Sequence, residues 1–369
     1  MVSKVFFVSA RAKMHSSPIE QFEKLLKTVG LGVFKENMSV AVKIHFGEKG
    51  STGYVHPTFV RALVDHLKDR KCQPFLTDTN TLYKGPRSKG VPHYELAIQN
   101  GFSYSVVNAP IFIADGIKST SVAELPAGPK YFKSVKIGKT IVEADALISV
   151  NHMKGHRLTG FGGAIKNLSM GCSSRATKQR MHADMKPTLV SEQKCIGCGR
   201  CVAICPVNAI RLHDGIAHFD IDKCVGCAEC LSICPEYAIK ILWEGSSTSV
   251  QEKMAEVALA VVKHFKTKIL HLNFLLNITP DCDCIKWTDT PVVQNIGILA
   301  SIDPVAIDQA SIDLIKKAPG LPDSRLPNKN SEGKEKFSLI HTDVDPEAQL
   351  RYGESIGLGS RRYELIPVN

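Results

Sequence analysis

Short apolar runs alternate with segments of helical periodicity along the first 150 residues of the chain. Four runs of mainly apolar residues predict buried strands, at residues 5–9, 40–45, 74–78 and 146–150. Residues 18–28 and 58–68 carry apolar side chains at helical spacing and predict helices. Strands and helices that alternate in this way are typical of parallel βαβ units. We therefore expect an α/β fold with a mostly parallel sheet flanked by helices.

The same alternation resumes after residue 242. Residues 268–276 and 292–300 predict strands, and residues 250–265 and 303–317 predict helices. Asp303 followed by Pro304 is typical of a helix start, with an N-cap residue before a proline at the first position. A cysteine-rich segment therefore interrupts one α/β layer. The expected organisation is a host domain in two parts, with an inserted domain between them, at residues 1–186, 187–242 and 243–369.

Length and composition limit the class of protein. A chain of 369 residues is long enough for two or three domains, and 44% hydrophobic residues can form a sizeable core. The sequence has no run of roughly 18 apolar residues, which a transmembrane helix would need. The first residues do not resemble a signal peptide. We therefore expect a cytoplasmic protein that does not interact with membranes.

Basic residues are concentrated in one stretch of the chain. The formal net charge is +10, and residues 153–186 contain seven Lys and Arg but only one Asp. Such a patch predicts a site for a small anionic ligand or an acidic partner. A solvated basic loop is the alternative interpretation. Phe161 is the single Phe, Tyr or Trp in this stretch, which argues against nucleic acid, because single strands need aromatic stacking platforms.

Eight of the twelve cysteines form two copies of one motif, C-x-x-C-x-x-C-x-x-x-C-P. The second copy starts 29 residues after the first, and ten of seventeen positions are identical. This spacing lets three thiolates bind one cuboidal cluster while the fourth, before the proline, reaches the other cluster. Cysteines in a chain without an export signal favour metal or redox chemistry over disulfides. Zinc is the alternative, although it favours paired C-x-x-C knuckles.

The repeated motif predicts two [4Fe–4S] clusters in an inserted α+β domain. The expected ligands of the first cluster are Cys195, Cys198, Cys201 and Cys234, and those of the second are Cys224, Cys227, Cys230 and Cys205. Gly197 and Gly226 are expected where the backbone wraps tightly around each cluster. The insert resembles a bacterial-type two-cluster ferredoxin.

Polar residues follow the predicted strands of the host domain. They form five sets, at residues 43–48, 78–81, 151–156, 277–284 and 301–303. Ligands of open parallel sheets bind beyond the carboxyl ends of the strands, so the five sets predict one shared pocket. Each residue alone also has a structural interpretation: His45 as a half-buried histidine, Asp78 as a turn residue and Asp303 as a helix cap.

Two segments of the host domain predict bound groups. A glycine-rich segment precedes an expected helix start with a lysine, which suits an anionic cofactor; its candidate ligands are Lys154, Gly160, Gly162, Gly163, Lys166 and Asn167. In residues 281–284 two cysteines alternate with two aspartates. Cys282 and Cys284 could bind a further metal together with Cys172, His152, His156 or His182. Redox-active or free thiols are the alternatives.

The whole chain resembles the family catalogued as domain of unknown function 362, in its branch of iron–sulfur-centre proteins. Four segments carry the resemblance, at residues 152–156, 160–171, 281–284 and 303–308. The resemblance implies a cytoplasmic prokaryotic protein with two clusters. It supplies no established substrate.

Two hypotheses for the function follow. The first is an iron–sulfur oxidoreductase that passes electrons between the clusters and a small anionic substrate or cofactor in the host pocket. His152 and His156 are candidate acid–base groups because histidine titrates near neutrality. Asp78, Asp281 or Asp303 would orient a histidine or a metal. The second is an electron carrier or assembly partner that docks another enzyme and has no substrate of its own. The expected redox partner is a ferredoxin or a reductase, and the oligomeric state is left open.

Overall fold

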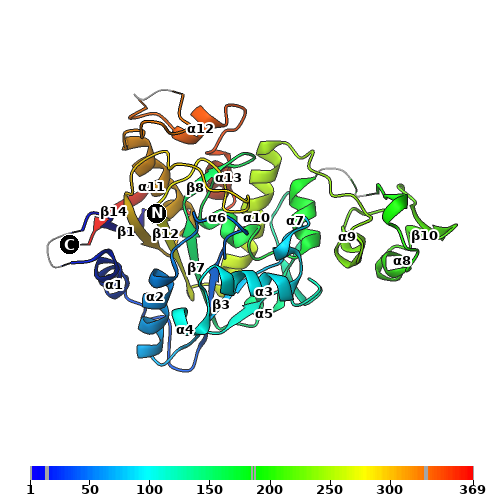
Figure 1. Cartoon of the computed structure of the whole chain (residues 1–369), viewed down its shortest axis with the longest axis horizontal. Coiled ribbons are helices and arrows are strands. Elements are labelled where there is room, and N and C mark those ends of the chain that lie inside the picture. Colours follow the sequence, from blue (N-terminus) through cyan, green and yellow to red (C-terminus); the bar gives the residue numbers. More distant parts are fainter. Residues whose placement is uncertain (1, 13–15, 184–185, 187, 328–330, 369) are drawn as a thin grey trace.

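One mixed sheet of eight strands forms the centre of the α/β body (Figure 1). The computed structural model describes residues 2–12, 16–183, 186, 188–327 and 331–368. In spatial order the strands are β14 (Tyr363–Pro367), β1 (Ser3–Ser9), β13 (Gly297–Ser301), β12 (Ile269–Leu275), β7 (Ala146–His152), β2 (Ser39–Ile44), β3 (Gln73–Asp78) and β4 (Ile111–Ile113). β13 runs antiparallel to both of its neighbours, and the other neighbouring pairs are parallel. The expected α/β fold with a mostly parallel sheet is confirmed.

Helices cover both faces of this sheet, which explains why its strands are apolar on both sides. In β2, Val40 and Val42 belong to the core on one face, and Ala41 belongs to the core on the other. The helices of the first face are α1 (Pro18–Val29), α2 (Pro57–Asp69) and α4 (Tyr104–Val107). Those of the second face are α5 (Lys139–Val142), α6 (Ala164–Ser169), α10 (Ser247–Phe265), α11 (Pro304–Lys317), α12 (Lys336–Ile340) and α13 (Ala348–Ser355).

The predicted strands and helices lie close to their expected bounds, with one exception. The strand expected at residues 292–300 begins only at Gly297, and Val293 forms an isolated bridge with Gly320 instead. The expected helix start is confirmed, since the Asp303 carboxylate accepts the backbone N–H groups of Val305 and Ala306. None of the helices in the described part of the chain combines the length and the apolar composition that a membrane crossing needs.

Shorter elements complete the body around the sheet. They are a 3-10 turn at Pro86–Ser88, α3 (Gly90–Gln99), α7 (Arg175–His182), and two small antiparallel pairs, β5 (Val122–Pro126) with β6 (Ser134–Gly138) and β8 (Lys154–His156) with β9 (Gly160–Gly162).

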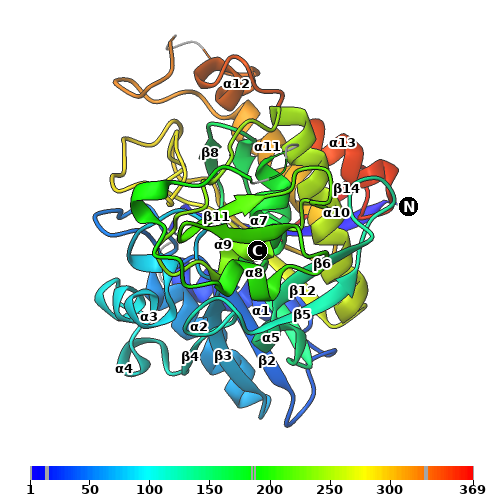
Figure 2. The ribbon, with the colours of Figure 1, turned by 90° about the vertical axis from the view of Figure 1, so that its right-hand side faces the viewer.

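The eight motif cysteines lie in a segment that projects from one side of the α/β body (Figure 1). Seen from that side, it lies in front of the body (Figure 2). We call residues 188–242 the cysteine segment; the boundary expected at residue 187 lies outside the described residues. Its elements are a 3-10 turn at Glu192–Lys194, α8 (Arg200–Ile204), β10 (Ile210–His213), β11 (Ile216–Phe219) and α9 (Glu229–Ile233). β10 and β11 pair antiparallel, and Ile210, Ala217, Leu231 and Ile239 form a small apolar cluster there.

Candidate functional site

A cavity of about 440 Å³ lies beyond the carboxyl ends of β2, β3 and β7. We call it the body cavity. Four of the five predicted polar sets contribute to its wall, through residues such as His45, Asp78, His152 and Cys282. These residues span more than 200 positions of the chain, and the parallel strands bring them together at the carboxyl ends of the strands.

The fifth predicted set is not at this edge, and that expectation is wrong. Residues 301–303 follow β13, which runs antiparallel to β12. The carboxyl end of β13 therefore lies beside the amino ends of the parallel strands, away from the body cavity. There Asp303 accepts hydrogen bonds from Ser3 Oγ at 2.7 Å and from the Ser360 N–H at 2.8 Å. Together with its capping bonds to α11, these contacts make Asp303 a structural residue.

Asp78 lies in the wall of the body cavity among three cationic or ionisable partners. Its carboxylate is 2.9 Å from Lys43 Nζ and 3.6 Å from both Arg87 and His93 Nε2. Burial raises the pKa of Asp78, but the charge of Lys43 and the interaction with His93 outweigh it, so the pKa lies well below its usual range. Asp78 is therefore a carboxylate, and it balances positive charge beneath the cavity.

A second buried carboxylate, Asp283, anchors two residues that were predicted to be functional. His152 Nδ1 lies 2.8 Å from one oxygen of Asp283, and Lys154 Nζ lies 3.1 Å from the other. Burial raises the pKa of Asp283, but His152 and Lys154 outweigh it and hold the pKa well below its usual range. His152 Nε2 faces the carbonyl oxygens of Leu276 and Asn277 at 3.0 Å. Both ring nitrogens of His152 thus have protein partners, which fits positioning better than acid–base work.

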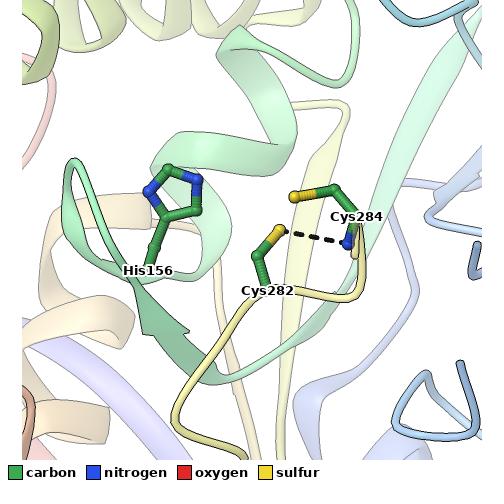
Figure 3. A group of neighbouring side chains, drawn as sticks. All are labelled: His156, Cys282 and Cys284. Carbon is green, nitrogen blue, oxygen red and sulfur yellow. Dashed lines mark hydrogen bonds between the residues drawn. The ribbon is translucent and has the colours of Figure 1, made fainter. Parts of the chain in front are cut away.

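His156, Cys282 and Cys284 converge beside this carboxylate (Figure 3). One ligand atom from each lies within 4.8 Å of the other two, and the imidazole ring points toward the two sulfurs. Cys282 Sγ accepts hydrogen bonds from the Cys284 N–H at 3.4 Å and from Lys166 Nζ at 3.2 Å. The hydrogen bond between the two thiol groups lowers the pKa of Cys282 and raises that of Cys284. These side chains are candidate metal ligands, and they make the chain a candidate metal-binding protein.

Two other predicted residues lie apart from this group. Cys172 is buried in the apolar core, where burial raises the pKa of its thiol to about 12. Asp281 forms ion pairs with Arg325 and, at 3.8 Å, with His341. It lines a second cavity of about 450 Å³, which we call the outer cavity. His156, Cys282 and Cys284 line both the outer cavity and the body cavity. The structure therefore brings His156 to the two cysteines, and not Cys172.

The glycine-rich segment differs from the anion site that was predicted for it. The first N–H groups of α6, from Ala164 and Ile165, bind the carboxylate of Asp308 at 2.7 and 3.0 Å. A side chain at Gly163 would place its Cβ 2.3 Å from that carboxylate, which explains the glycine. Gly160 and Gly162 are strand residues that pair with β8. The first backbone N–H groups of α6 thus already have a hydrogen-bond acceptor within the protein.

Asn167 likewise has a structural place. Its amide donates to the carbonyl oxygens of Lys43 and Val150 and to Asn151 Oδ1, and its own oxygen accepts Lys43 Nζ at 2.7 Å. These bonds use both N–H hydrogens of its amide and one of the two lone pairs of its oxygen. Asn167 therefore ties β2, β7 and α6 together under the body cavity.

Positive charge nevertheless dominates the wall of the body cavity. Arg87, Lys154, Lys166 and Lys178 line it, and Asp78 is its one carboxylate among the described lining residues. Lys178 Nζ donates to three neutral oxygens, those of the Thr79 hydroxyl, Asn80 and Ser173. Burial lowers its pKa to about 8. A cavity with this balance of charge favours a small anionic ligand.

In the cysteine segment, the eight cysteines line two separate hollows. Four of them, Cys195, Cys198, Cys201 and Cys234, line the first. The other four, Cys205, Cys224, Cys227 and Cys230, line the second. Each hollow thus takes three cysteines from one copy of the motif and the last cysteine of the other copy.

The two copies of the motif also share their backbone geometry. The Ala209 N–H donates to Cys205 Sγ at 3.2 Å, and the Ala238 N–H donates to Cys234 Sγ at 3.3 Å. Gly197 and Gly226 have φ values of +63° and +68°, in the left-handed region that favours glycine. The repeat in the sequence is therefore a repeat in the structure.

Helix α7 connects the body cavity with the cysteine segment. Lys178 and His182 of α7 line the cavity, and Arg175 at its start donates to the carbonyl oxygens of Ser232 and Leu82, both at 3.3 Å. Leu82 lines the cavity as well, and it packs in the apolar cluster that includes Cys230. Leu82 and Arg175 thus connect the body cavity with the cysteine segment.

Three residues of the site were not assigned a role from the sequence. Lys43, Arg87 and Asp283 are all buried and form the ion pairs beneath the cavity. Lys43 carried a signal, because a lysine within a buried apolar strand needs a partner. Of the two aspartates in residues 281–284, the sequence predicted a role for Asp281, although Asp281 lies nearer the surface than Asp283. Arg87 lies in the short 3-10 turn at Pro86–Ser88, whose sequence has no periodicity that could indicate a buried side chain.

Comparison with solved structures gives distant likenesses. One is to the lactate racemase apoprotein from Thermoanaerobacterium thermosaccharolyticum, with 13% identity, a TM-score of 0.35, and coverage of 69% of this chain and 49% of that chain. Another is to a structural-genomics target from Thermotoga maritima, with 12% identity, a TM-score of 0.44, and coverage of 80% and 56%. The chain spans about half the length of both. No curated protein matches it.

The family comparison is more extensive. The family model described as domain of unknown function (DUF362) matches residues 40–313, which include the strands below the body cavity, the cysteine segment and the group formed by His156, Cys282 and Cys284. The match covers well over half of the chain. The chain belongs to the DUF362 family.

Proposed function

We propose that this chain is an iron–sulfur oxidoreductase of the DUF362 family. Residues 187–242 would act as a ferredoxin-like unit with two [4Fe–4S] clusters, and the body cavity would bind a small anionic substrate or cofactor. When bound, such clusters supply transfer of single electrons. The family membership and the candidate metal ligands support metal binding in general. A reducing cytoplasm would suit its many thiols.

The cysteine segment fits two cuboidal clusters. Thiolates around one tetrahedral zinc would lie about 3.8 Å apart. Among the described residues, no three cysteines of this segment come within 4.8 Å of one another, although four of them surround each hollow. A cuboidal cluster accounts for this wider spread, because each thiolate binds a different iron. Backbone N–H groups directed at Cys205 and Cys234 would stabilise the negative charge of a bound cluster.

The contacts between the wall of the body cavity and the cysteine segment carry the proposal. Leu82 lines the body cavity and packs in the apolar cluster of the cysteine segment. Helix α7 contributes Lys178 to the cavity, and its Arg175 donates to the carbonyl oxygen of Ser232 in α9. A ligand in the cavity would therefore lie close to the cysteine-lined hollows. A protein that only carries electrons has no need of a cationic cavity at this place.

An oxidation experiment tests the proposal. Anaerobically purified protein would be reduced with dithionite, freed of excess reductant and mixed with small anionic oxidants, while cluster absorbance is followed. We expect one class of anion to reoxidise the wild type and Lys154→Met to react at least tenfold more slowly with its clusters intact. Loss of a charge-assisted contact worth about 1.5–3 kcal/mol gives an effect of this size. Equal rates in both proteins would refute a substrate role for the cavity.

The second candidate is an electron carrier that docks another enzyme. Ile196 and Val225, at equivalent positions of the two motif copies, are 65% and 61% exposed. Exposed apolar side chains beside the hollows suit contact with a redox partner such as a ferredoxin or a reductase. Under this alternative, substituting both residues with Ser would slow electron exchange with the partner, and cavity variants would have no effect.

A further inference from the structure

We propose that His156, Cys282 and Cys284 form a mononuclear site for a thiophilic divalent ion, for which zinc is the test case, with one coordination position open to the body cavity. This site is separate from the eight motif cysteines. Its existence does not depend on the proposed function, although the role of its open position does.

The chemistry of the three side chains selects the kind of ion. Two thiolates and one imidazole are soft to intermediate ligands, which favour zinc over magnesium or calcium. Zinc sites with three protein ligands keep a fourth position for water or substrate, whereas structural sites have four. Among the described residues, no fourth ligand-type side chain joins this group within 4.8 Å. The number of ligands therefore points to an open site.

The geometry needs only a small adjustment to hold the ion. Ligand atoms around a tetrahedral zinc lie about 3.4–3.8 Å apart, and here they lie within 4.8 Å. Cys282 and Cys284 belong to the connection between β12 and β13, outside any regular element, so their sulfurs can move by the required distance of about 1 Å. His156 ends the short strand β8, which fixes its position.

Neighbouring groups can orient the ligands. The Nδ1 atom of His156 lies 3.0 Å from Thr159 Oγ1, and that hydroxyl donates to the carbonyl oxygen of Phe161. With an ion on Nε2, Nδ1 would carry the proton and donate it to Thr159, as a metal-bound histidine usually donates to a neighbouring acceptor. The contacts of Nδ1 with the Leu158 and Thr159 N–H groups would then open. Lys166 and the Cys284 N–H already bind Cys282 Sγ, as is usual for thiolate ligands.

The surroundings indicate what the open position would bind. All three ligands line both the body cavity and the outer cavity, so the ion would be accessible from solvent. Two thiolates neutralise a divalent ion, and Asp283 already balances Lys154. The charge of Lys166, 3.2 Å from Cys282, would then favour a negatively charged ligand at the fourth position. If the proposed function is right, that ligand is its anionic substrate.

Metal content and coordination test the proposal. The full-length protein, purified anaerobically with its iron in place, would be equilibrated with micromolar zinc and washed. We expect about one zinc per chain, with two sulfurs and one imidazole nitrogen at the zinc K-edge. Cys282→Ser, Cys284→Ser and His156→Gln should each weaken zinc binding by about 100-fold or more, since even outer-shell changes cost 10–100-fold. Cys172→Ser, a buried cysteine outside the group, is the matched control and should bind as the wild type does.

The outcomes separate this proposal from the function of the clusters. Zinc bound equally by Cys282→Ser and the wild type, or bound by four sulfurs, would overturn it. So would a wild type that binds no zinc, for example because Cys282 and Cys284 form a disulfide. An unchanged iron content in the variants would show that the clusters are unaffected. If a variant fails to fold, the zinc K-edge spectrum of the wild type still shows whether two sulfurs and one imidazole nitrogen bind the zinc. Failure of the oxidation experiment with zinc bound would refute only the proposed function.

Discussion

The cysteine segment and the body cavity are built in opposite ways. In the segment, the cysteines that line each hollow come from within about forty positions of one another, and the two copies of the motif are 29 residues apart. In the cavity, Asp78, Lys154 and Cys284 come from three distant parts of the chain. The first arrangement depends on spacing along the sequence. The second depends on the order and direction of strands in a sheet.

The ionisable side chains of the two regions also differ in how deeply they are buried. The described motif cysteines are mostly half-buried around open hollows. Asp78 and Asp283 are almost fully buried, each beside lysine or histidine. A buried charge is costly unless it is paired, so the cavity depends on its partners for stability as well as for function. A substitution in the cysteine segment should therefore leave the body cavity unchanged, and a substitution in the cavity should leave the segment unchanged.

The largest expected effect concerns the crossed cysteine sets. Two clusters require about eight iron and eight acid-labile sulfide per chain, and Cys205→Ala should remove about half of each. Because Cys205 lines the same hollow as Cys224, adding Cys224→Ala should cause no further loss. Adding Cys198→Ala, from the other hollow, should remove the remainder. Iron and sulfide assays under anaerobic conditions measure this.

The double variants distinguish crossed from uncrossed ligands. If Cys205 shared a cluster with Cys198, that pair would lose no more iron than Cys205→Ala alone. Cys205→Ala should also leave urea unfolding of the α/β body unchanged by circular dichroism. A large loss of stability there would show that the two regions are not separate.

The next effect concerns the buried carboxylate below the cavity. Asp283→Asn leaves His152 and Lys154 without their counter-charge, and removing one partner of a buried pair costs about 3–5 kcal/mol of unfolding free energy. Asp281→Asn is the matched control: its carboxylate is 16% exposed and pairs with a half-exposed Arg325, so the cost should stay below about 1 kcal/mol. Urea unfolding compares them. Equal losses would contradict the structural role of Asp283, and iron content should be unchanged in both.

Periodicity and spacing were enough for most elements and for grouping the cysteines. Apolar runs such as residues 40–45 are buried on both faces, which is why they are so continuous. The motif spacing indicated the crossed sets that line the two hollows. These features are local, so the sequence contains them directly. Their role as cluster ligands stays a prediction.

Periodicity and spacing do not predict the direction of a strand or the tertiary partner of a side chain. Nothing in an apolar run tells whether it is parallel or antiparallel, so residues 301–303 were placed at the wrong edge. The glycines before α6 looked like an anion site because the carboxylate that occupies the helix start, Asp308, comes from α11. His156 was one of several candidate partners of Cys282, and only the fold separates it from Cys172.

A smaller effect should appear in mild acid. Burial lowers the pKa of His271, in the central strand β12, to about 3, whereas an unfolded histidine has a pKa of about 6.5. Between these values the unfolded chain binds a proton that the folded chain does not, so stability is lost as the pH falls from 6.5 toward 3. At pH 5 the loss from this residue is about 2 kcal/mol. The difference between the unfolding free energies at pH 6.5 and pH 5 should therefore become smaller in His271→Phe, while other buried histidines such as His182 keep their own share of it. An unchanged difference would contradict a neutral buried imidazole.

The smallest expected effect concerns ligand binding by a single cation of the cavity. Lys166 lies in the cavity wall with the Cys282 sulfur as its partner, so its charge is available to an anion there. Lys166→Met should weaken binding of a small dicarboxylate, oxalate, by about tenfold, which corresponds to about 1.4 kcal/mol for one charge-assisted contact. Lys84→Met removes the same charge from an exposed side chain and should change affinity less than about twofold. Calorimetry at low ionic strength measures both. Equal weakening by the two variants would mean that net charge, and not this cavity, attracts the anion.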